Sequence, residues 1–187
     1  EMLRSLVGSE MCIRDSPNIK ESQANKALVD AVSDMEGVAV FNLYELSQEI
    51  AFNVDEWSKI ISDASAVIYQ FPFYWMSAPS LLKKWQDEVF TFLSKTPAVA
   101  GKSLTVVTTT GSEYEAYRSG GRNRFTMDEL LRPYQVSAIH SGMSWQTPIV
   151  VYGMGTADAG KNIAEGANLY KQRVEMLIGS SNAGNNW

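Results

Sequence analysis

The chain has 187 residues, of which 45% are hydrophobic and 20% are charged, and its formal net charge is −5. This length suits one domain with a single core. The acidic balance argues against a nucleic-acid-binding protein, because such proteins concentrate positive charge on one face. No apolar run is long enough to cross a bilayer, and the N-terminus lacks the apolar core of a signal peptide. Cys12 is the single cysteine, so no intrachain disulfide can form, and we expect a cytoplasmic protein.

Helix and strand patterns alternate along the chain. A helix is expected to begin at Ser22, a favourable N-cap, and to end at Gly37, a typical C-cap residue. Further patterns predict strands over 38–42, 66–70, 103–109 and 149–152, and helices over 54–64, 80–92, 127–141 and 157–178. Pro133 is expected near the start of its helix or at a kink in it. Residues 179–187 are polar and are expected to form a frayed tail.

This alternation predicts a parallel sheet with helices on both faces. Right-handed crossovers leave few topologies for five strands, and the commonest small one has the strand order 2-1-3-4-5 in a three-layer α/β sandwich. In such a fold the ligand site lies at the carboxyl ends of the strands. We therefore expect the loops after Ile13, Gln70 and Thr109 to meet there.

The loop after the strand 66–70 is the most informative part of the sequence. Phe71 and Pro72 end the strand, and the aromatic residues Phe73, Tyr74 and Trp75 follow before the next helix. Aromatic side chains at the carboxyl end of a strand are well placed to contact a flat ligand, and a flavin is the ligand we expect. The alternative is that Trp75 is an ordinary core residue.

Two other loops carry polar groups that suit the same ligand. Free backbone N–H groups where the helix at Ser22 begins can bind a phosphate, although Ser22 alone is more simply explained as an N-cap. Residues 108–112 place hydroxyl groups at a strand end, and Gly111 allows close approach of the backbone. That loop can hydrogen-bond the polar edge of a flavin ring, but threonine-rich strand ends are common.

Together, the three loops resemble those of one family, the flavodoxin-like NAD(P)H:quinone oxidoreductases, over about residues 16–177. The family includes small bacterial reductases that act as ancillary subunits of potassium-efflux systems. Its most specific motif, Pro-x-x-Trp followed by Pro and Leu-Leu-Lys-x-Trp-x-Asp-x-Val-Phe, is present at 72–90. Its Thr-Thr-Gly-Gly motif occurs as Thr-Thr-Gly-Ser, and its His-Pro and Ser-x-Ala-Asn motifs occur as Ser-Pro and Ser-Gln-Ala-Asn. The resemblance implies that the flavin is bound by Ser16, Ser22, Gln23, Ala24, Asn25, Phe73, Tyr74, Trp75, Met76, Thr109, Thr110, Gly111 and Ser112.

The resemblance also implies a reaction. Members hold FMN (the alternative here is FAD) and transfer a hydride from NAD(P)H through the flavin to quinones, two electrons at a time, by a ping-pong mechanism. They are homodimers whose partner chain covers the flavin, and some associate with a membrane transporter. Two alternatives remain open: a flavodoxin-type electron carrier, and a flavin-binding regulatory subunit of a potassium-efflux system. We find no metal-ligand cluster and expect no metal.

Residues 113–125 form a glycine-containing loop with three arginines in an otherwise acidic chain. These charges either attract the phosphates of NAD(P)H or only make the loop soluble. The family's ring-facing tyrosine corresponds best to Tyr117, which we predict to be catalytic.

The N-terminal segment departs from the family pattern. Ser16 stands where the family has histidine, and 10–16 is not the expected apolar strand. Residues 10–16 match the translation of a transposon-end sequencing adapter, so we interpret 1–16 as a non-native segment, 17–178 as the flavin-binding domain and 179–187 as a polar C-terminal tail. Met11, Cys12 and Ile13 can still fill the first-strand position, but Arg14 and Asp15 would then be buried at a cost.

Overall fold

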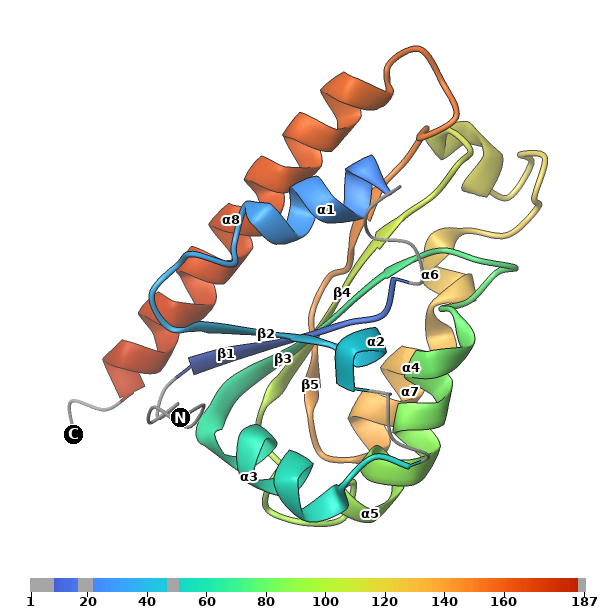
Figure 1. Ribbon diagram of the computed structural model, residues 1–187. Coiled ribbons are helices and arrows are strands. Elements are labelled where there is room, and N and C mark those ends of the chain that lie inside the picture. The colour runs from blue at the N-terminus through green and yellow to red at the C-terminus, as the bar shows by residue number, and fades with distance from the viewer. Residues whose placement is uncertain (1–8, 17–21, 47–50, 185–187) are drawn as a thin grey trace.

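The computed structural model describes residues 9–16, 22–46 and 51–184. Its sheet contains β1 (Ser9–Arg14), β2 (Val38–Asn42), β3 (Ala64–Pro72), β4 (Ser103–Thr109), β5 (Ser144–Trp145) and β6 (Ile149–Val151). The strands pair in parallel in the order β2-β1-β3-β4-β5. The strand β6 also pairs with β4, further along it than β5 does. Because β5 and β6 follow one another along β4, they form one interrupted edge strand. The predicted five-stranded order 2-1-3-4-5 is confirmed (Figure 1).

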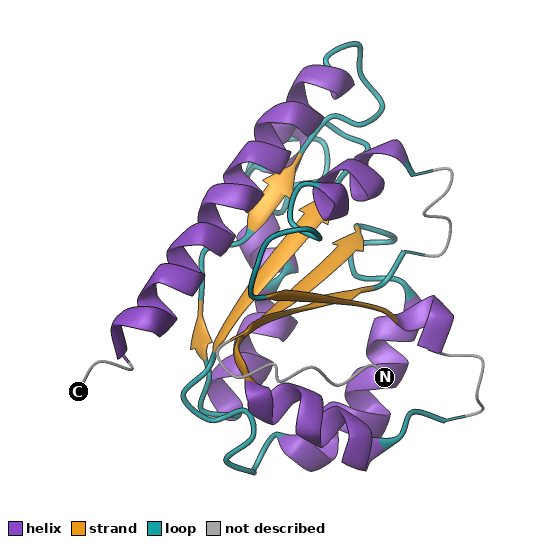
Figure 2. Ribbon diagram, turned by 60° about the vertical axis from the view of Figure 1, so that its left-hand side comes forward, coloured by secondary structure: helices purple, strands orange, loops and turns teal. Residues whose placement is uncertain are grey.

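Helices cover both faces of this sheet (Figures 1 and 2). The helical segments are α1 (Gln23–Asp30), α2 (Leu43–Leu46), α3 (Val54–Asp63), α4 (Ser80–Trp85), the π-helical turn η1 (Gln86–Phe90), α5 (Thr91–Leu93), the 3₁₀ turn η2 (Tyr114–Tyr117), α6 (Met127–Leu130), α7 (Arg132–His140) and α8 (Ala159–Gly184). One layer is formed by α1 and α8, which pack on each other and on the sheet, and α3, α4, α5 and α7 lie on the opposite face. The result is the expected three-layer sandwich.

Alternating side chains along the central strands fill the two cores. Ile68 of β3 contacts the layer of α1 and α8, where Tyr170 is fully buried. The neighbouring residues Tyr69 and Phe71 point to the other face and join the larger core. Trp85 lies in that core, edge-to-face with Trp57 at a ring-centroid distance of 5.2 Å. A strand buried on both faces must be apolar on both sides, which explains the continuous apolar runs in the sequence.

The structure refines several predicted boundaries. The strands predicted over 38–42 and 103–109 have those bounds, whereas β3 is longer than 66–70 at both ends. The helix predicted over 127–141 is divided into α6 and α7 at Leu131, with Pro133 in the first turn of α7, where the missing N–H costs nothing. The final helix runs to Gly184 rather than 178, so most of the predicted tail is helical. The short strand β5 was missed because two residues carry no periodicity.

The predicted non-native segment supplies the central strand β1, with Cys12 and Ile13 fully buried. Its charged residues are buried too: Glu10 and Asp15 have no exposed surface, and Arg14 is 8% exposed. Burying charges in a central strand is costly unless each is well paired. Arg14 forms an ion pair with Glu45 at 3.8 Å. The interpretation of residues 1–16 as non-native stays a prediction.

Asp15 has nevertheless acquired a structural role. Its Oδ2 accepts a hydrogen bond of 2.7 Å from the N–H of Leu82, in the first turn of α4. The N-cap of α4 is Pro79, whose side chain cannot cap the helix, so the Asp15 carboxyl takes that place. Burial raises the pKa of Asp15 from 3.8 to about 6. The folded chain therefore holds a proton that the unfolded chain has already lost between these two pH values.

Because the folded-state pKa of Asp15 is raised, its contribution to stability is complete below about pH 4 and is lost as pH rises through about 6. Asp15→Asn keeps a carbonyl acceptor for Leu82 but cannot ionise. We expect the unfolding free energy of this variant, relative to that of the unmodified chain, to be higher at pH 8 than at pH 4 by on the order of 2 kcal/mol. Urea unfolding at both pH values measures this difference. The exposed Asp34→Asn is the control, and an equal pH effect in the two variants would contradict the assignment.

Candidate functional site

The three predicted loops meet at one edge of the sheet because β1, β3 and β4 run parallel and end together. Thr109, the last residue of β4, connects them. Its carbonyl accepts a hydrogen bond of 2.9 Å from the N–H of Phe73, and its Oγ1 accepts one of 3.1 Å from Nδ2 of Asn25. Gln70 adds a second connection, since its Nε2 donates to the carbonyl of Asn25 at 2.9 Å. The predicted convergence of the loops is therefore present in the structure.

The aromatic loop ends in a strained, exposed turn. Tyr74 and Ser77 exchange two backbone hydrogen bonds of 2.8 and 3.0 Å, and the two residues between them have positive φ: 47° at Trp75 and 64° at Met76. Left-handed backbone at bulky residues costs about 1–2 kcal/mol each and is concentrated at functional sites. The Trp75 side chain is 98% exposed. The alternative that Trp75 is an ordinary core residue is therefore wrong for this chain.

Tyr134 of α7 holds this turn from below, and the sequence did not single it out. Its hydroxyl lies 3.1 Å from Oγ of Ser77 and accepts a hydrogen bond of 3.0 Å from the N–H of Ala78. The ring is buried against Phe71, at a centroid distance of 5.4 Å. No sequence pattern links residues so far apart in the chain, and α7 has no pronounced apolar face that would have marked Tyr134 as buried.

In the loop after β4, some polar groups are exposed to solvent and others are buried. The Thr109 and Thr110 side chains are buried, and Oγ1 of Thr110 donates to the carbonyl of Ser112 at 2.7 Å. Gly111 is exposed, and a Cβ there would meet no described atom within 4 Å. The accessible groups are therefore the backbone at Gly111 and the side chain of Ser112, rather than the threonine hydroxyls that the sequence suggested.

A fourth loop, which sequence reasoning missed, braces this one. The N–H groups of Gly153, Met154 and Gly155 donate in turn to the carbonyls of Ser112, Thr110 and Gly111, at 2.8, 2.9 and 2.9 Å. A Cβ at Gly155 would lie 3.1 Å from the Gly111 carbonyl oxygen, so glycine is what permits this close approach. Two glycines directly after the apolar strand 149–152 were the available signal.

The first loop reaches α1 through residues outside the described part, Pro17 included. Ser16 is buried at the end of β1, and Ser22 is the N-cap of α1, its Oγ accepting a hydrogen bond of 3.4 Å from the N–H of Asn25. The Gln23 side chain is exposed, whereas Ala24 and Asn25 are buried. Oδ1 of Asn25 is buried and lacks a hydrogen-bond partner among the described residues. No acidic residue lies in the first turn of α1.

Tyr117 lies beside the aromatic loop. Its ring is 6% exposed and packs edge-on to Phe73 at 6.1 Å and against Tyr152 at 5.8 Å. Burial raises the pKa of Tyr152 to about 12, with Tyr114 and Asp128 adding to the effect, so this phenol stays protonated at neutral pH. Tyr117 is thus next to the residues predicted to hold a flavin ring.

The arginines of the neighbouring loop are not equivalent. Arg122 contacts the predicted site, because its Nη2 donates a hydrogen bond of 2.6 Å to Oγ of Ser112. Arg118 lies over the ring of Tyr114 at 5.3 Å. Arg124 has a positive φ of 63° and an exposed side chain.

These groups fit a flavin mononucleotide chemically. The N-terminus of α1, whose first turn holds no acidic residue, suits a phosphate. The exposed turn at Trp75 offers aromatic surface to a planar ring, and the open space at Gly111 leaves room for the ring edge. Within residues 9–16, 22–46 and 51–184 there is no group of three or more His, Cys, Asp or Glu that could hold a metal ion. In the same ranges, no helix combines the length and the apolar character needed to cross a bilayer.

A family model described as a flavodoxin-like fold matches residues 11–174. The chain therefore belongs to the flavodoxin-like family. The uncharacterized NAD(P)H oxidoreductase YdeQ of Bacillus subtilis is 35% identical over 165 residues, which cover 86% of this chain and 83% of that protein. The glutathione-regulated potassium-efflux system ancillary protein KefG of Pectobacterium atrosepticum is 34% identical over 140 residues, or 73% of this chain and 76% of the relative.

Solved structures agree with this relationship. General stress protein 14 of Treponema denticola, in complex with FMN, has a TM-score of 0.82 and 27% identity, and the match covers 90% of this chain and 99% of that one. An NADPH-quinone reductase from P. pentosaceus has a TM-score of 0.76 and 26% identity, with 89% and 97% coverage. The predicted relationship to flavodoxin-like NAD(P)H:quinone oxidoreductases is confirmed.

Tyr134→Phe should loosen the turn at 74–77 without disturbing the core. The substitution leaves the Ala78 N–H without its acceptor, which should cost about 1–2 kcal/mol of unfolding free energy. Amide hydrogen exchange across 73–79 should become faster. Tyr69→Phe is the matched control, because Tyr69 is buried in the same ring cluster without touching the turn. Equal exchange at 73–79 in both variants would show that Tyr134 does not hold the turn.

Proposed function

We propose that this chain is an FMN-dependent NAD(P)H:quinone oxidoreductase. The observation that carries the proposal is the strained turn at Trp75, presented at the carboxyl edge of the sheet beside the open space at Gly111. A protein gains no stability from a solvent-exposed tryptophan on strained backbone, so a ligand contact is the better explanation. The FMN complex of the Treponema denticola relative and the NADPH-quinone reductase of P. pentosaceus support the same reading.

In this proposal, each loop would bind a different part of FMN. The start of α1, with Ser22, Gln23, Ala24 and Asn25, would bind the phosphate, with Ser16 close to the same loop. The aromatic loop, Phe73 to Met76, would support the ring, and Thr109 to Ser112 would meet its polar edge. Bound FMN supplies the hydride acceptor and donor, which no side chain of the chain provides. The protein orients the ring and keeps one of its faces open to substrates.

Tyr117 is the residue we assign to catalysis. Its ring contacts Phe73 of the aromatic loop and Tyr152, so Tyr117 borders the place where a flavin ring supported by Phe73 would lie. A tyrosine hydroxyl there can donate a hydrogen bond to charge that develops on the ring edge. NAD(P)H and the quinone would use the same open face in turn, which gives ping-pong kinetics.

Association with other chains is part of the proposal. The exposed turn of Tyr74, Trp75 and Met76 is a surface that a second copy of the chain would cover in a homodimer, as the family resemblance implies. The similarity to KefG supports a second candidate role, as a flavin-binding ancillary subunit of a potassium-efflux transporter that associates peripherally with the membrane. The single buried Cys12 is compatible with the cytoplasm, where we place the protein.

The cofactor assignment predicts a yellow protein. Purified protein should release FMN, rather than FAD, on denaturation, and mass spectrometry identifies the flavin. Trp75→Ala should raise the FMN dissociation constant about 5- to 10-fold, since a stacked aromatic contact contributes on the order of 1 kcal/mol. Phe92→Ala, which removes another exposed aromatic ring on α5, is the matched control. Protein that binds neither flavin on reconstitution would overturn the assignment.

Flavin reduction by NAD(P)H separates the enzyme from an electron carrier. In stopped-flow mixing, NADH or NADPH should bleach the flavin absorbance in a fast saturable phase, and double-reciprocal plots with a quinone should be parallel. Tyr117→Phe should slow the bleaching about 10- to 100-fold with the FMN content unchanged. Bleaching no faster than that of free FMN would favour the carrier, and an unchanged rate in the variant would remove Tyr117 from the mechanism.

A further inference from the structure

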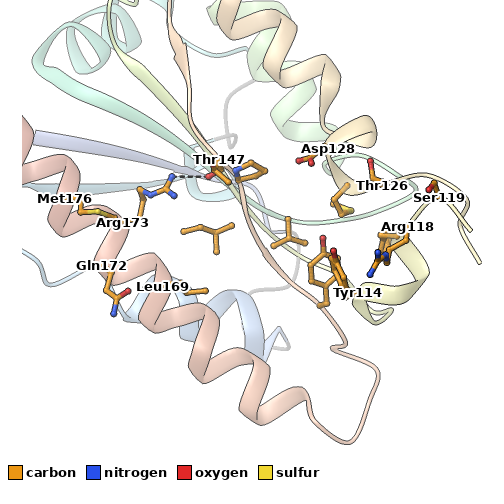
Figure 3. A pocket seen from close by; sticks show the side chains of 16 residues that line it. Tyr114, Arg118, Ser119, Thr126, Asp128, Thr147, Leu169, Gln172, Arg173 and Met176 are labelled. Carbon is orange, nitrogen blue, oxygen red and sulfur yellow. Dashed lines mark hydrogen bonds between the residues drawn. The ribbon is translucent and has the colours of Figure 1, made fainter. Parts of the chain in front are cut away.

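A cavity among the described residues lies beside the predicted flavin loops and not within them. It has a volume of about 600 Å³, in the range of small-molecule sites. Its floor is the edge strand around Pro148 and Val150, and its walls are α8 on one side and the segment from η2 to α6 on the other (Figure 3). Of the residues assigned to flavin or catalysis, the cavity contains only Tyr117.

Two arginines face this cavity from opposite sides (Figure 3). Arg173 of α8 is held in place, because its Nη1 donates to the carbonyl of Thr147 at 3.0 Å. Arg118 is held by its position over the Tyr114 ring, at 5.3 Å. Asp128 supplies the single carboxylate of the lining. In a chain of net charge −5, this arrangement makes the cavity locally positive and suited to an anion.

The rest of the lining suits a flat or apolar group. Tyr114 is 49% exposed and lies edge-on to Tyr152 at 5.3 Å. Leu169 and Met176 of α8 are 55% and 59% exposed, although they line a concave surface. Exposed apolar side chains gathered in a hollow are typical of a ligand site. This lining suits a ligand that combines negative charge with a planar ring.

Tyr117 places this cavity next to the proposed site of hydride transfer. Its ring contacts both Phe73 of the aromatic loop and Tyr152 of the cavity. We infer that the cavity binds the adenosine diphosphate part of NAD(P)H, while the nicotinamide lies on the flavin side of Tyr117. This inference rests on the proposed function, and it assigns Arg118 and Arg173 to the diphosphate and Tyr114 to the adenine.

The test removes each charge and varies the hydride donor. In Arg118→Gln and Arg173→Gln, the NAD(P)H concentration that half-saturates flavin reduction should rise about tenfold, since one charge-assisted hydrogen bond is lost. The limiting rate should stay the same. N-benzyl-1,4-dihydronicotinamide, which lacks the adenosine diphosphate part, should reduce the flavin equally well in both variants and in the unmodified chain. Arg132→Gln, an exposed arginine on α7 outside the cavity, is the control.

Binding of ADP-ribose, measured by calorimetry, tests the cavity without any redox reaction. The unmodified chain and Arg132→Gln should bind it, and both cavity variants should bind it about tenfold more weakly. The Arg118 side chain lies over the Tyr114 ring, and no hydrogen bond from it to a described backbone carbonyl is seen, unlike that of Arg173. The Arg118→Gln variant therefore covers the case in which Arg173→Gln alters the fold. Unchanged NAD(P)H saturation together with no ADP-ribose binding would overturn the cavity assignment. If no donor reduces the flavin, the proposed function fails, and ADP-ribose binding alone then decides the cavity.

Discussion

The parallel register of β1, β3 and β4 is the constraint on which the rest of the structure depends. It pairs Ile13 with Tyr69 and Pro72 with Thr109, so the three strands end at one edge and their loops must share space. Backbone N–H and carbonyl groups in crowded loops need partners, and Thr109 and Gln70 provide them. The candidate site is therefore a consequence of satisfying the polar groups at a sheet edge, and a small shift in register would separate its parts.

Rigid support allows this edge to carry strain. The left-handed turn at Trp75 and Met76 lies on the core ring cluster through Tyr134, and 110–112 are fixed by the loop at 153–155. A strained turn of this kind is stable only where several surrounding contacts hold it in place. The same packing brings Tyr117 into contact with Phe73 of the aromatic loop and into the lining of the neighbouring cavity, so that one side chain borders both proposed sites.

The N-terminal strand shows that overall topology tolerates a poor local sequence. Residues 10–14 pair with both β2 and β3 although Glu10 and Arg14 are buried. The backbone hydrogen bonds and the apolar residues Cys12 and Ile13 suit an interior strand of the sheet. The buried charged side chains of Glu10 and Arg14 lower the stability of this strand. The capping contact between Asp15 and Leu82 recovers part of that loss.

The sequence by itself determined the alternation of strands and helices, the strand order and the three loops. Hydrophobic periodicity, helix-capping residues and aromatic residues in loops are local signals that a sequence carries directly. It also marked Tyr117 and the aromatic loop. Only the tertiary structure decided that Trp75 is exposed on strained backbone, that the hydroxyls of Thr109 and Thr110 turn inward, and that Tyr134 and the loop at Gly153 support the site. The cavity with Arg118 and Arg173 likewise depends on segments distant in the chain. Such contacts follow from packing between elements, which no local pattern records.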